Sequence, residues 1–339
     1  MEIGLAKMRI RYPLRMELSG LRVGTMLSIG HMEADIRLRP LIDRTLRVDV
    51  VTARDISIHT SARDTTTFLA EHLRADDIAY QWDEREISIR RILLADSDMK
   101  LSGSTPPQPK DSSPNGLPFS LSIADIQIHH IGASYSNAQV SLQSEASHIA
   151  IHDIAVDTAI RASLQHARIE DVTLTLERAG SMPWQLTRLH LQADSLRYSS
   201  SSITGKLTHL TFKESHGIDL QDGALAFAWD NGTLSLPSFV LRTGHSTLQG
   251  HLHTLSYGTA DTPLYGDAHL SLGYADAYLL ARRIGGPAQE LSSLYPTETL
   301  SASLALNGTM RHLRLTRCAI SLPTAFDISL SGAVHDIAT

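Results

Sequence analysis

Cysteine is almost absent from this sequence of 339 residues, which contains only Cys318. One cysteine cannot form an intrachain disulfide, and it cannot supply the several thiolates of a structural zinc site. The fold must therefore be stabilised without covalent cross-links. Both a reducing and an oxidising compartment are compatible with this composition.

Long hydrophobic runs are also missing. No window approaches the roughly 18 consecutive apolar residues that a membrane-spanning helix needs, and no signal peptide opens the chain. Strand-like alternation is present from Ile3 and Leu5 onward and recurs at Ile328 and Leu330 near the other end. We therefore expect the sequence to be a fragment of a longer protein.

Aromatic residues make up only 5% of the chain, and acidic residues outnumber basic ones. A net charge of −6 argues against nucleic-acid binding, which normally requires a basic stripe. The hydrophobic content of 42% is nevertheless sufficient for folding. Leu, Ile, Val and Ala carry it, and this composition favours long one-sided sheets over a large compact core.

Motifs for catalysis are absent as well. The sequence has no P-loop and no G-x-G-x-x-G, and Ser246 lacks the G-x-S-x-G context of a hydrolase nucleophile. Acidic doublets such as Asp76-Asp77 fall where turn residues are expected, so they do not indicate a pair of glycosidase carboxylates. We expect no enzymatic activity and no cofactor.

The 17 histidines invite interpretation as metal ligands. His148 and His152 have the spacing of a helical zinc pair, but they lie in strand pattern, where four residues span roughly 13 Å. His251 and His253 share a strand face, yet no third ligand follows at a recognisable spacing. We interpret the histidines as solvated side chains of a sheet face and expect no metal.

What the sequence does contain is a two-residue alternation of apolar side chains, clearest between Leu121 and Glu177. This period places apolar side chains on one face of a strand and polar side chains on the other. The spacing stretches to three across polar doublets, and a bulge or tight turn must absorb each extra residue. The doublets in this stretch are Ala124-Asp125, His129-His130, His152-Asp153 and Glu170-Asp171.

The alternation extends through most of the chain and predicts a mainly β fold. Short turns link the strands, and Asn231-Gly232 and Asn307-Gly308 have the sequence of tight hairpins. We expect an elongated antiparallel meander, a repeating, taco-like β-groove with two short helical segments. The absence of strand-helix-strand alternation excludes an α/β enzyme fold.

Two β segments, residues 1–102 and 119–339, flank a stretch rich in proline and serine at 103–118. Its prolines cannot pair in a sheet, so the stretch is either a linker between domains or an exposed loop inside one continuous sheet. Helical spacing predicts a short helix near 65–74. A second helix is expected near 276–294, where it either caps the sheet or serves as a lid or a partner-binding element.

A resemblance to a known family enters in the second segment. The sequence Thr-Phe-Lys-Glu-Ser-His-Gly at 211–217 is followed by Leu234-x-Leu236-Pro237 and by Leu241-x-Thr243-x-x-Ser246. These motifs resemble those of AsmA-like envelope proteins, particularly the TamB type. Residues 10–58 are similar to the early repeats of that family.

The resemblance implies a long curved β-sheet that spans the periplasm and whose hydrophobic groove moves phospholipid or assists the assembly of outer-membrane proteins. It also implies a parent protein anchored in the inner membrane by one N-terminal helix, with a BamA-like barrel protein of the outer membrane as partner. This sequence lacks the anchor helix and the characteristic C-terminal region of the family, which again indicates a fragment.

A hydrophobic groove would bind phospholipid acyl chains, because each buried methylene contributes about 0.8 kcal/mol. The same alternation would equally fill a closed core, so both arrangements remain open at this point. The candidate lining residues are the apolar alternators Ile126, Ile128, Ile149, Ile151, Ile154, Val156, Val172, Leu174, Leu176, Leu225, Phe227, Leu234, Leu236, Leu270 and Leu272.

An alternative function is a β-repeat binding or adhesive protein that recognises a protein or a glycan without lipid. Such a protein would expose clustered aromatic side chains on its loops. The three Trp and nine Tyr of this chain are instead scattered along the strand pattern.

Overall fold

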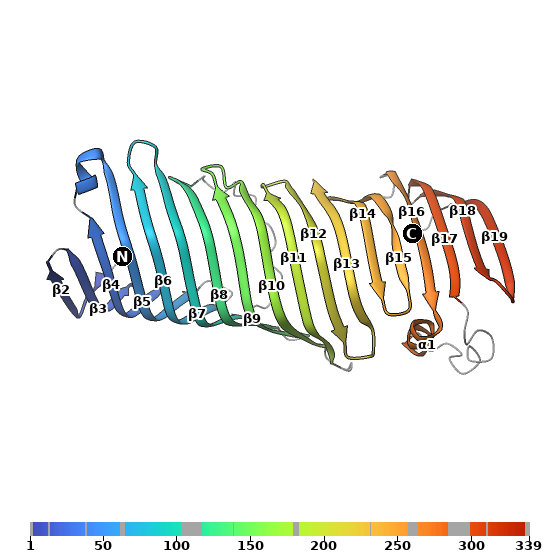
Figure 1. Ribbon diagram of the computed structural model, residues 1–339, viewed down its shortest axis with the longest axis horizontal. Coiled ribbons are helices and arrows are strands. Elements are labelled where there is room, and N and C mark those ends of the chain that lie inside the picture. Colours follow the sequence, from blue (N-terminus) through green and yellow to red (C-terminus); the bar gives the residue numbers. More distant parts are fainter. Residues whose placement is uncertain are drawn as a thin grey trace. The chain divides into compact units, whose positions relative to one another are not determined.

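The computed structural model describes residues 3–12, 14–37, 39–61, 65–102, 117–137, 139–178, 183–230, 232–256, 263–283, 299–309 and 311–335. The fold is mainly β, as the alternation predicts, and its strands follow one another as antiparallel meanders (Figure 1). The chain forms two compact units, Met1–Leu189 and His190–Thr339. The division between them falls within strand β11 (Trp184–Tyr198), whereas the sequence pattern separates its two β segments at 103–118.

Unit 1 is a single sheet with one turn of 3-10 helix, η1 (Arg39–Asp43). Consecutive strands from β2 to β10 pair with one another, and β1 also pairs with β3. The strands are β1 (Ile3–Gly4), β2 (Lys7–Arg11), β3 (Arg15–Val23), β4 (Leu27–Arg37), β5 (Thr45–Ser61), β6 (Thr65–Gln81), β7 (Glu86–Ser102), β8 (Ser120–Ser136), β9 (Val140–Val156) and β10 (Ala162–Arg178).

One pair in unit 1 departs from the antiparallel rule. β7 and β8 are parallel, with Glu86 opposite Ser120 and Ser102 opposite Ser136. A parallel connection needs a crossover of about a dozen residues or more, and the proline-rich stretch between these strands has that length. Residues 103–116 of the stretch lie outside the described residues, but the strands on either side of it are neighbours in one sheet.

Each strand from β5 to β10 contains one residue with a left-handed backbone. In the ladders from β5 to β10 the paired residues skip one or two positions at each of two places, so the skipped positions form two rows across the sheet. The first row continues into β3 and β4. The first crease consists of Gly20, Gly30, Asp55, Glu71, Asp96, His130, Ser147 and Asp171. The second crease consists of Asp49, Asp77, Arg90, Ala124, Asp153 and Gln165.

Chain direction decides which crease receives the left-handed residue. Strands that run in the direction of β5 place it in the first crease, as Asp55, Asp96, His130 and Asp171 do, and the reversed strands β6 and β9 place it in the second, at Asp77 and Asp153. Aspartate tolerates this conformation better than most residues. The expected irregularities at His129-His130, His152-Asp153 and Glu170-Asp171 are therefore confirmed. Ala124 has no left-handed backbone but lies opposite Asp153 in the second crease.

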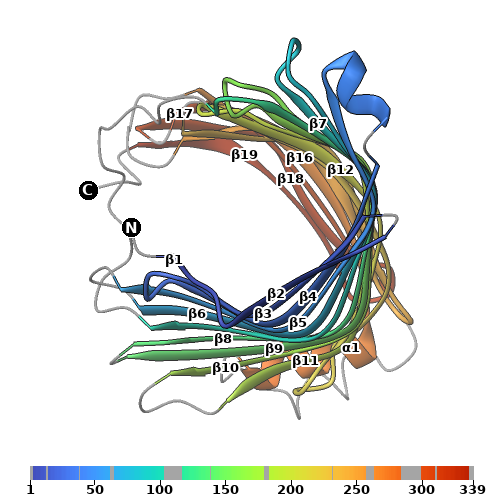
Figure 2. The same cartoon turned by 90° about the vertical axis from the view of Figure 1, so that its left-hand side faces the viewer.

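The sheet of unit 1 bends toward its apolar face. Figure 2 shows the strands from β4 to β10 curving along their length. Apolar residues that flank the first crease are among the least exposed of the chain, with Ala70 at 3%, Ala53 at 4% and Ile56 at 7%. Side chains converge on the inside of a bend, so this burial identifies the apolar face as the concave one.

The helix predicted near 65–74 is wrong, because these residues belong to strand β6. Phe68 lies opposite Ile58 and Met99, and Leu73 lies opposite Ala53 and Leu94. The apolar spacing changes from two to three between Ala70 and Leu73, where β6 crosses the first crease. A spacing of three residues between apolar side chains is also typical of a helical turn, so the sequence pattern is the same in both cases.

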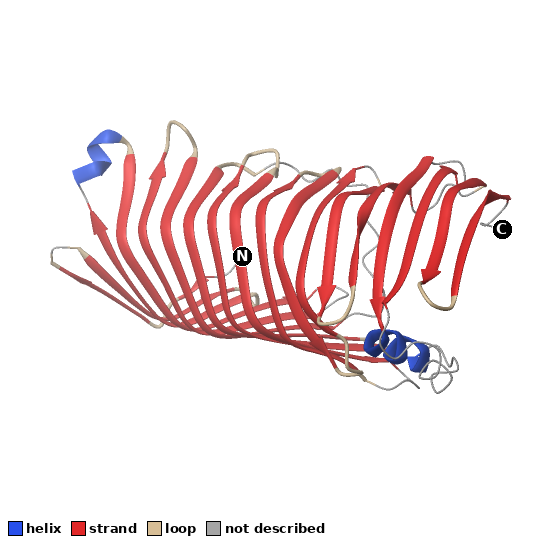
Figure 3. Ribbon diagram, turned by 45° about the vertical axis from the view of Figure 1, so that its right-hand side comes forward, coloured by secondary structure: helices blue, strands red, loops and turns tan. Residues whose placement is uncertain are grey.

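The described residues of unit 2 form an antiparallel meander and one α-helix (Figure 3). Of the hairpin predicted at Asn231-Gly232, Asn231 lies outside the described residues, but Asp230 pairs with Thr233 and Gly232 has φ 82°, as a tight turn between β13 and β14 requires. The elements are β12 (Ser202–Glu214), β13 (Asp219–Asp230), β14 (Thr233–Thr243), β15 (Thr247–Ser256), β16 (Pro263–Gly273), α1 (Tyr274–Arg283), β17 (Thr299–Thr309), β18 (His312–Leu322) and β19 (Phe326–His335).

The hairpin predicted at Asn307-Gly308 is wrong. Both residues lie inside β17, and Asn307 pairs with Tyr265 on one side and Arg314 on the other. A Cβ atom on Gly308 would come within 2.1 Å of the His312 carbonyl oxygen, so the glycine permits close approach of two strands rather than a turn.

The second predicted helix is confirmed as α1, which covers the first part of the expected range, and residues 284–298 lie outside the described residues. Its Ala277 packs against Leu322, whose exposure is 2%, and Leu272 and Leu300 complete this cluster. The Asp276 carboxylate accepts hydrogen bonds from the hydroxyls of Thr243 and Ser246, each at 2.5 Å. These contacts support the interpretation that the helix caps the sheet.

Candidate ligand-binding surface

The apolar side chains of β5–β10 form unbroken rows across one face of unit 1. Between the two creases, one row consists of Ala53, Leu73, Leu94, Ile128, Ile149 and Ile169 in direct register. The adjacent row consists of Val51, Ala75, Ile92, Ile126, Ile151 and Ala167. We call this face, with its continuation beyond both creases, the apolar lane.

The lane does not end at the creases. Beyond the second crease its next row consists of Val48, Ile78, Ile89, Ile123 and Ile154. Beyond the first crease, Phe68 lies opposite Met99 and Leu142 lies opposite Leu176. A cluster around Ala53, Ile56 and Ala70 packs side chains from both sides of the first crease together. The extra residue at each crease is left out of the strand pairing. The apolar side chains before and after a crease therefore stay on the same face of the sheet.

All nine candidate lining residues of unit 1 lie in this lane. Val172 is buried, at 6% exposure, and the others are half-buried. The described residues of unit 1 contain no second sheet that could cover them. The half-buried residues are Ile126, Ile128, Ile149, Ile151, Ile154, Val156, Leu174 and Leu176.

In unit 2 the six remaining candidates are also half-buried, at Leu225, Phe227, Leu234, Leu236, Leu270 and Leu272. They pair with other apolar residues across the strands: Leu225 lies opposite Leu207 and Phe239, and Leu236 lies opposite Leu252. At the end of β16 the apolar face of unit 2 is covered, because α1 packs on Leu272. Elsewhere in unit 2 the apolar face remains partly accessible.

The opposite face of unit 1 is polar, and histidines there contact carboxylates of neighbouring strands. His148 Nδ1 lies 3.3 Å from Glu170, and His152 Nδ1 lies 3.2 Å from Asp125. The rings of His129 and His148 stack with their centres 4.8 Å apart. The hydrogen bond with His148, reinforced by Arg168, lowers the pKa of the Glu170 carboxyl and outweighs the opposing effect of burial.

The histidines whose sequence spacing resembles that of metal ligands contact separate carboxylates in the structure. His148 and His152 face different carboxylates, while in unit 2 His251 pairs with Asp267. A hollow of about 540 Å³ lies on the polar face, lined among others by His31, Arg54 and His72. Sequence reasoning missed this hollow, because the residues that line it come from five strands, β4 to β8.

Ser246 connects the β14–β15 turn with α1 through its hydroxyl group. Its hydroxyl donates to Asp276 and accepts a hydrogen bond from the Gly273 backbone N–H at 3.0 Å. These bonds attach the β14–β15 turn to the start of α1.

Two further observations bear on the identity of the chain. No helix among the described residues combines the length and apolarity of a membrane span. The sequence matches no protein-family model, and a search of curated proteins found no match.

Proposed function

We propose that the chain is a non-enzymatic lipid-binding module whose apolar lane holds the acyl chains of phospholipid. The observation that carries this proposal is the partial exposure of the apolar lane of unit 1 and of the apolar face of unit 2: 14 of the 15 candidate residues are half-buried rather than buried. A filled core would bury such side chains, whereas an uncovered apolar face of this length needs something to cover it.

An acyl chain is well suited to such a lane. Burial of each methylene contributes about 0.8 kcal/mol without any directional contact, so a long chain gains several kcal/mol from apolar contact alone. The lane presents Ile, Leu, Val and Ala in rows without a charged residue in the two central rows. It therefore offers contact to an acyl chain with little dependence on position, as expected for conduction along the sheet.

The resemblance to TamB-type proteins extends the proposal to a cellular setting. In that setting the chain would be part of a periplasmic protein anchored in the inner membrane, and it would pass phospholipid toward the outer membrane or assist assembly of its proteins. A BamA-like barrel would be the partner of the parent protein.

The test compares two substitutions at neighbouring positions of β10. Leu174 lies in the lane opposite Ser144, and Thr175 lies on the polar face opposite Gln143. Mass spectrometry of gently extracted protein should detect phospholipid with the wild type and with Thr175→Asp, and at least tenfold less with Leu174→Asp. Circular dichroism would check that both variants are folded.

Absence of phospholipid from all three proteins, together with failure of added fluorescent fatty acid to bind, would overturn the proposal. Retention of full lipid binding by folded Leu174→Asp would overturn it too. Binding of a protein or glycan that is lost only in Thr175→Asp would instead support the β-repeat binding function.

A further inference from the structure

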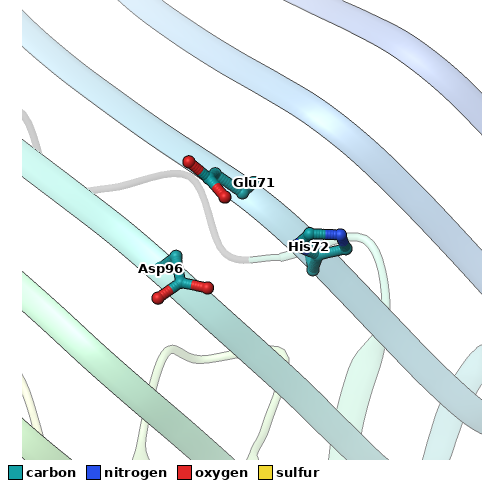
Figure 4. Close-up of side chains that lie close together, drawn as sticks. All are labelled: Glu71, His72 and Asp96. Carbon is teal, nitrogen blue, oxygen red and sulfur yellow. The ribbon is translucent and has the colours of Figure 1, made fainter.

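Three metal-ligand side chains meet at the first crease of unit 1. Glu71 and His72 come from β6 and Asp96 from the neighbouring strand β7 (Figure 4). One ligand atom from each of these residues lies within 4.8 Å of the other two. Ligand atoms about 2.0–2.2 Å from one ion lie at most about 4.4 Å apart, so small movements of these side chains would let them share an ion.

The crease explains why these residues meet. Adjacent residues of a regular strand point to opposite faces, so Glu71 and His72 would normally diverge. Here Glu71 occupies a skipped position of the ladder, and its neighbour across the strands is Asp96, which has φ 52°. The same row continues on β8 with His130, whose Nδ1 lies 3.6 Å from an Asp96 carboxylate oxygen. His130 therefore neighbours Asp96, although it is not one of the three residues whose ligand atoms lie within 4.8 Å of one another.

The charges at this point are not balanced by arginine or lysine. Like charges on directly opposed strand positions are destabilising. In the second crease arginines neutralise the acidic side chains: Arg37 pairs with Asp49, and Arg90 pairs with Asp77. At the first crease neither Glu71 nor Asp96 has an ion pair with arginine or lysine among the described residues, and the contact of Asp96 with His130 carries charge only if the imidazole is protonated. Two carboxylates that converge without a protein cation favour an external one.

We propose that Glu71, His72 and Asp96 bind a divalent transition-metal ion. A mixed set of imidazole and carboxylate ligands suits Zn²⁺ or Mn²⁺ rather than Ca²⁺ or Mg²⁺, which prefer oxygen alone. All three side chains are exposed, so water would complete the coordination. The ion would link β6 to β7 at the bend, a role separate from lipid binding in the lane.

The experiment titrates the full chain, freed of metal by a chelator, with zinc chloride and with manganese chloride in a calorimeter. The variants are His72→Ala and Asp96→Asn, and the control is His209→Ala. His209 also lies beside a carboxylate, but this neighbour, Asp222, is already paired with Arg242. The wild type and His209→Ala should each show one saturable site per chain with the same affinity. His72→Ala and Asp96→Asn should bind the ion at least tenfold more weakly than the wild type.

A thermal melt gives an independent readout. Without metal, Glu71→Gln should melt at or above the wild-type temperature, since it removes a like-charge contact, and zinc should raise the melting temperature of the wild type only. The proposal is overturned if no saturable site exists with either ion, if His209→Ala weakens binding as much as His72→Ala, or if both crease variants bind as the wild type does.

Discussion

Asp96 of β7 and His130 of β8 occupy equivalent positions in parallel neighbouring strands, and both have left-handed backbones, with φ 52° and 54°. In the antiparallel neighbours of β7 and β8 the left-handed residue moves to the other crease, at Asp77 and Asp153. Each strand from β5 to β10 therefore contributes one left-handed residue to the bend of the sheet. This relationship connects the sequence doublets to the concavity of the apolar lane.

The first prediction concerns the backbone at Asp153, an exposed residue with φ 54°. Asp153→Val should lower the free energy of unfolding by about 1–2 kcal/mol, because a β-branched residue is strained in this conformation. Asp153→Gly should have a much smaller effect. Urea unfolding followed by circular dichroism would measure both. Ala155→Val, two residues along the same strand in extended backbone, is the matched control and should be neutral.

The second prediction concerns pH. The folded-state pKa of Glu170 is lowered by its hydrogen bond with His148, and that of Asp35 is lowered by its hydrogen bond with Arg15. A carboxyl whose pKa is lowered by folding stabilises the protein above its unfolded pKa and loses that contribution as the pH falls through its folded pKa. The unfolding temperature should therefore decrease below about pH 4, and less steeply in Glu170→Gln than in the wild type.

The control for this pH profile is Glu177→Gln, on the same strand. Glu177 forms no ion pair or hydrogen bond with its side chain among the residues that the structure describes. Its variant should follow the wild-type profile. A Glu170→Gln profile that matched the wild type at every pH would show that the contact with His148 is not maintained in solution.

The third prediction concerns the attachment of α1. Asp276→Ala removes the acceptor of the Thr243 and Ser246 hydroxyl hydrogen bonds, and charge-assisted bonds of this kind contribute about 1.5–3 kcal/mol each. Hydrogen exchange should increase in α1 while the amides of β12 and β13 stay protected. Asp219→Asn, an exposed position of β13, should leave α1 unchanged. Equal protection of α1 in both variants would mean that packing on Leu322 alone holds the helix.

The fourth prediction uses the single cysteine as a probe of the apolar face of unit 2. Cys318 is half-buried and lies between Leu304 and Leu330 on neighbouring strands. A thiol reagent should modify it in the lipid-free protein, and added fatty acid should slow the modification at least several-fold. A matched cysteine at Ser329, with Cys318 replaced by serine, lies at an alternate strand position and should react at the same rate with and without fatty acid.

Much of the fold follows from residues a few positions apart. The alternation of Ile149, Ile151, Ile154 and Val156 predicts a strand, its apolar face and the irregularity at His152-Asp153, because all three depend on local backbone geometry. The same locality explains the wrong helix at 65–74. The three-residue step between Ala70 and Leu73 has one sequence signature in a helix and in a creased strand, and only the neighbouring strands distinguish them.

By itself the sequence determined that the protein is built from one-faced strands with no disulfide, and it identified the apolar residues that form the lane. The tertiary structure alone decided which of these strands are neighbours and in what register. It made β7 and β8 parallel, placed His130 beside Asp96, and brought Glu71 and His72 to the same point. The physical reason is range: side-chain alternation is a property of one strand, whereas register depends on turns, crossovers and pairings between residues distant in the chain.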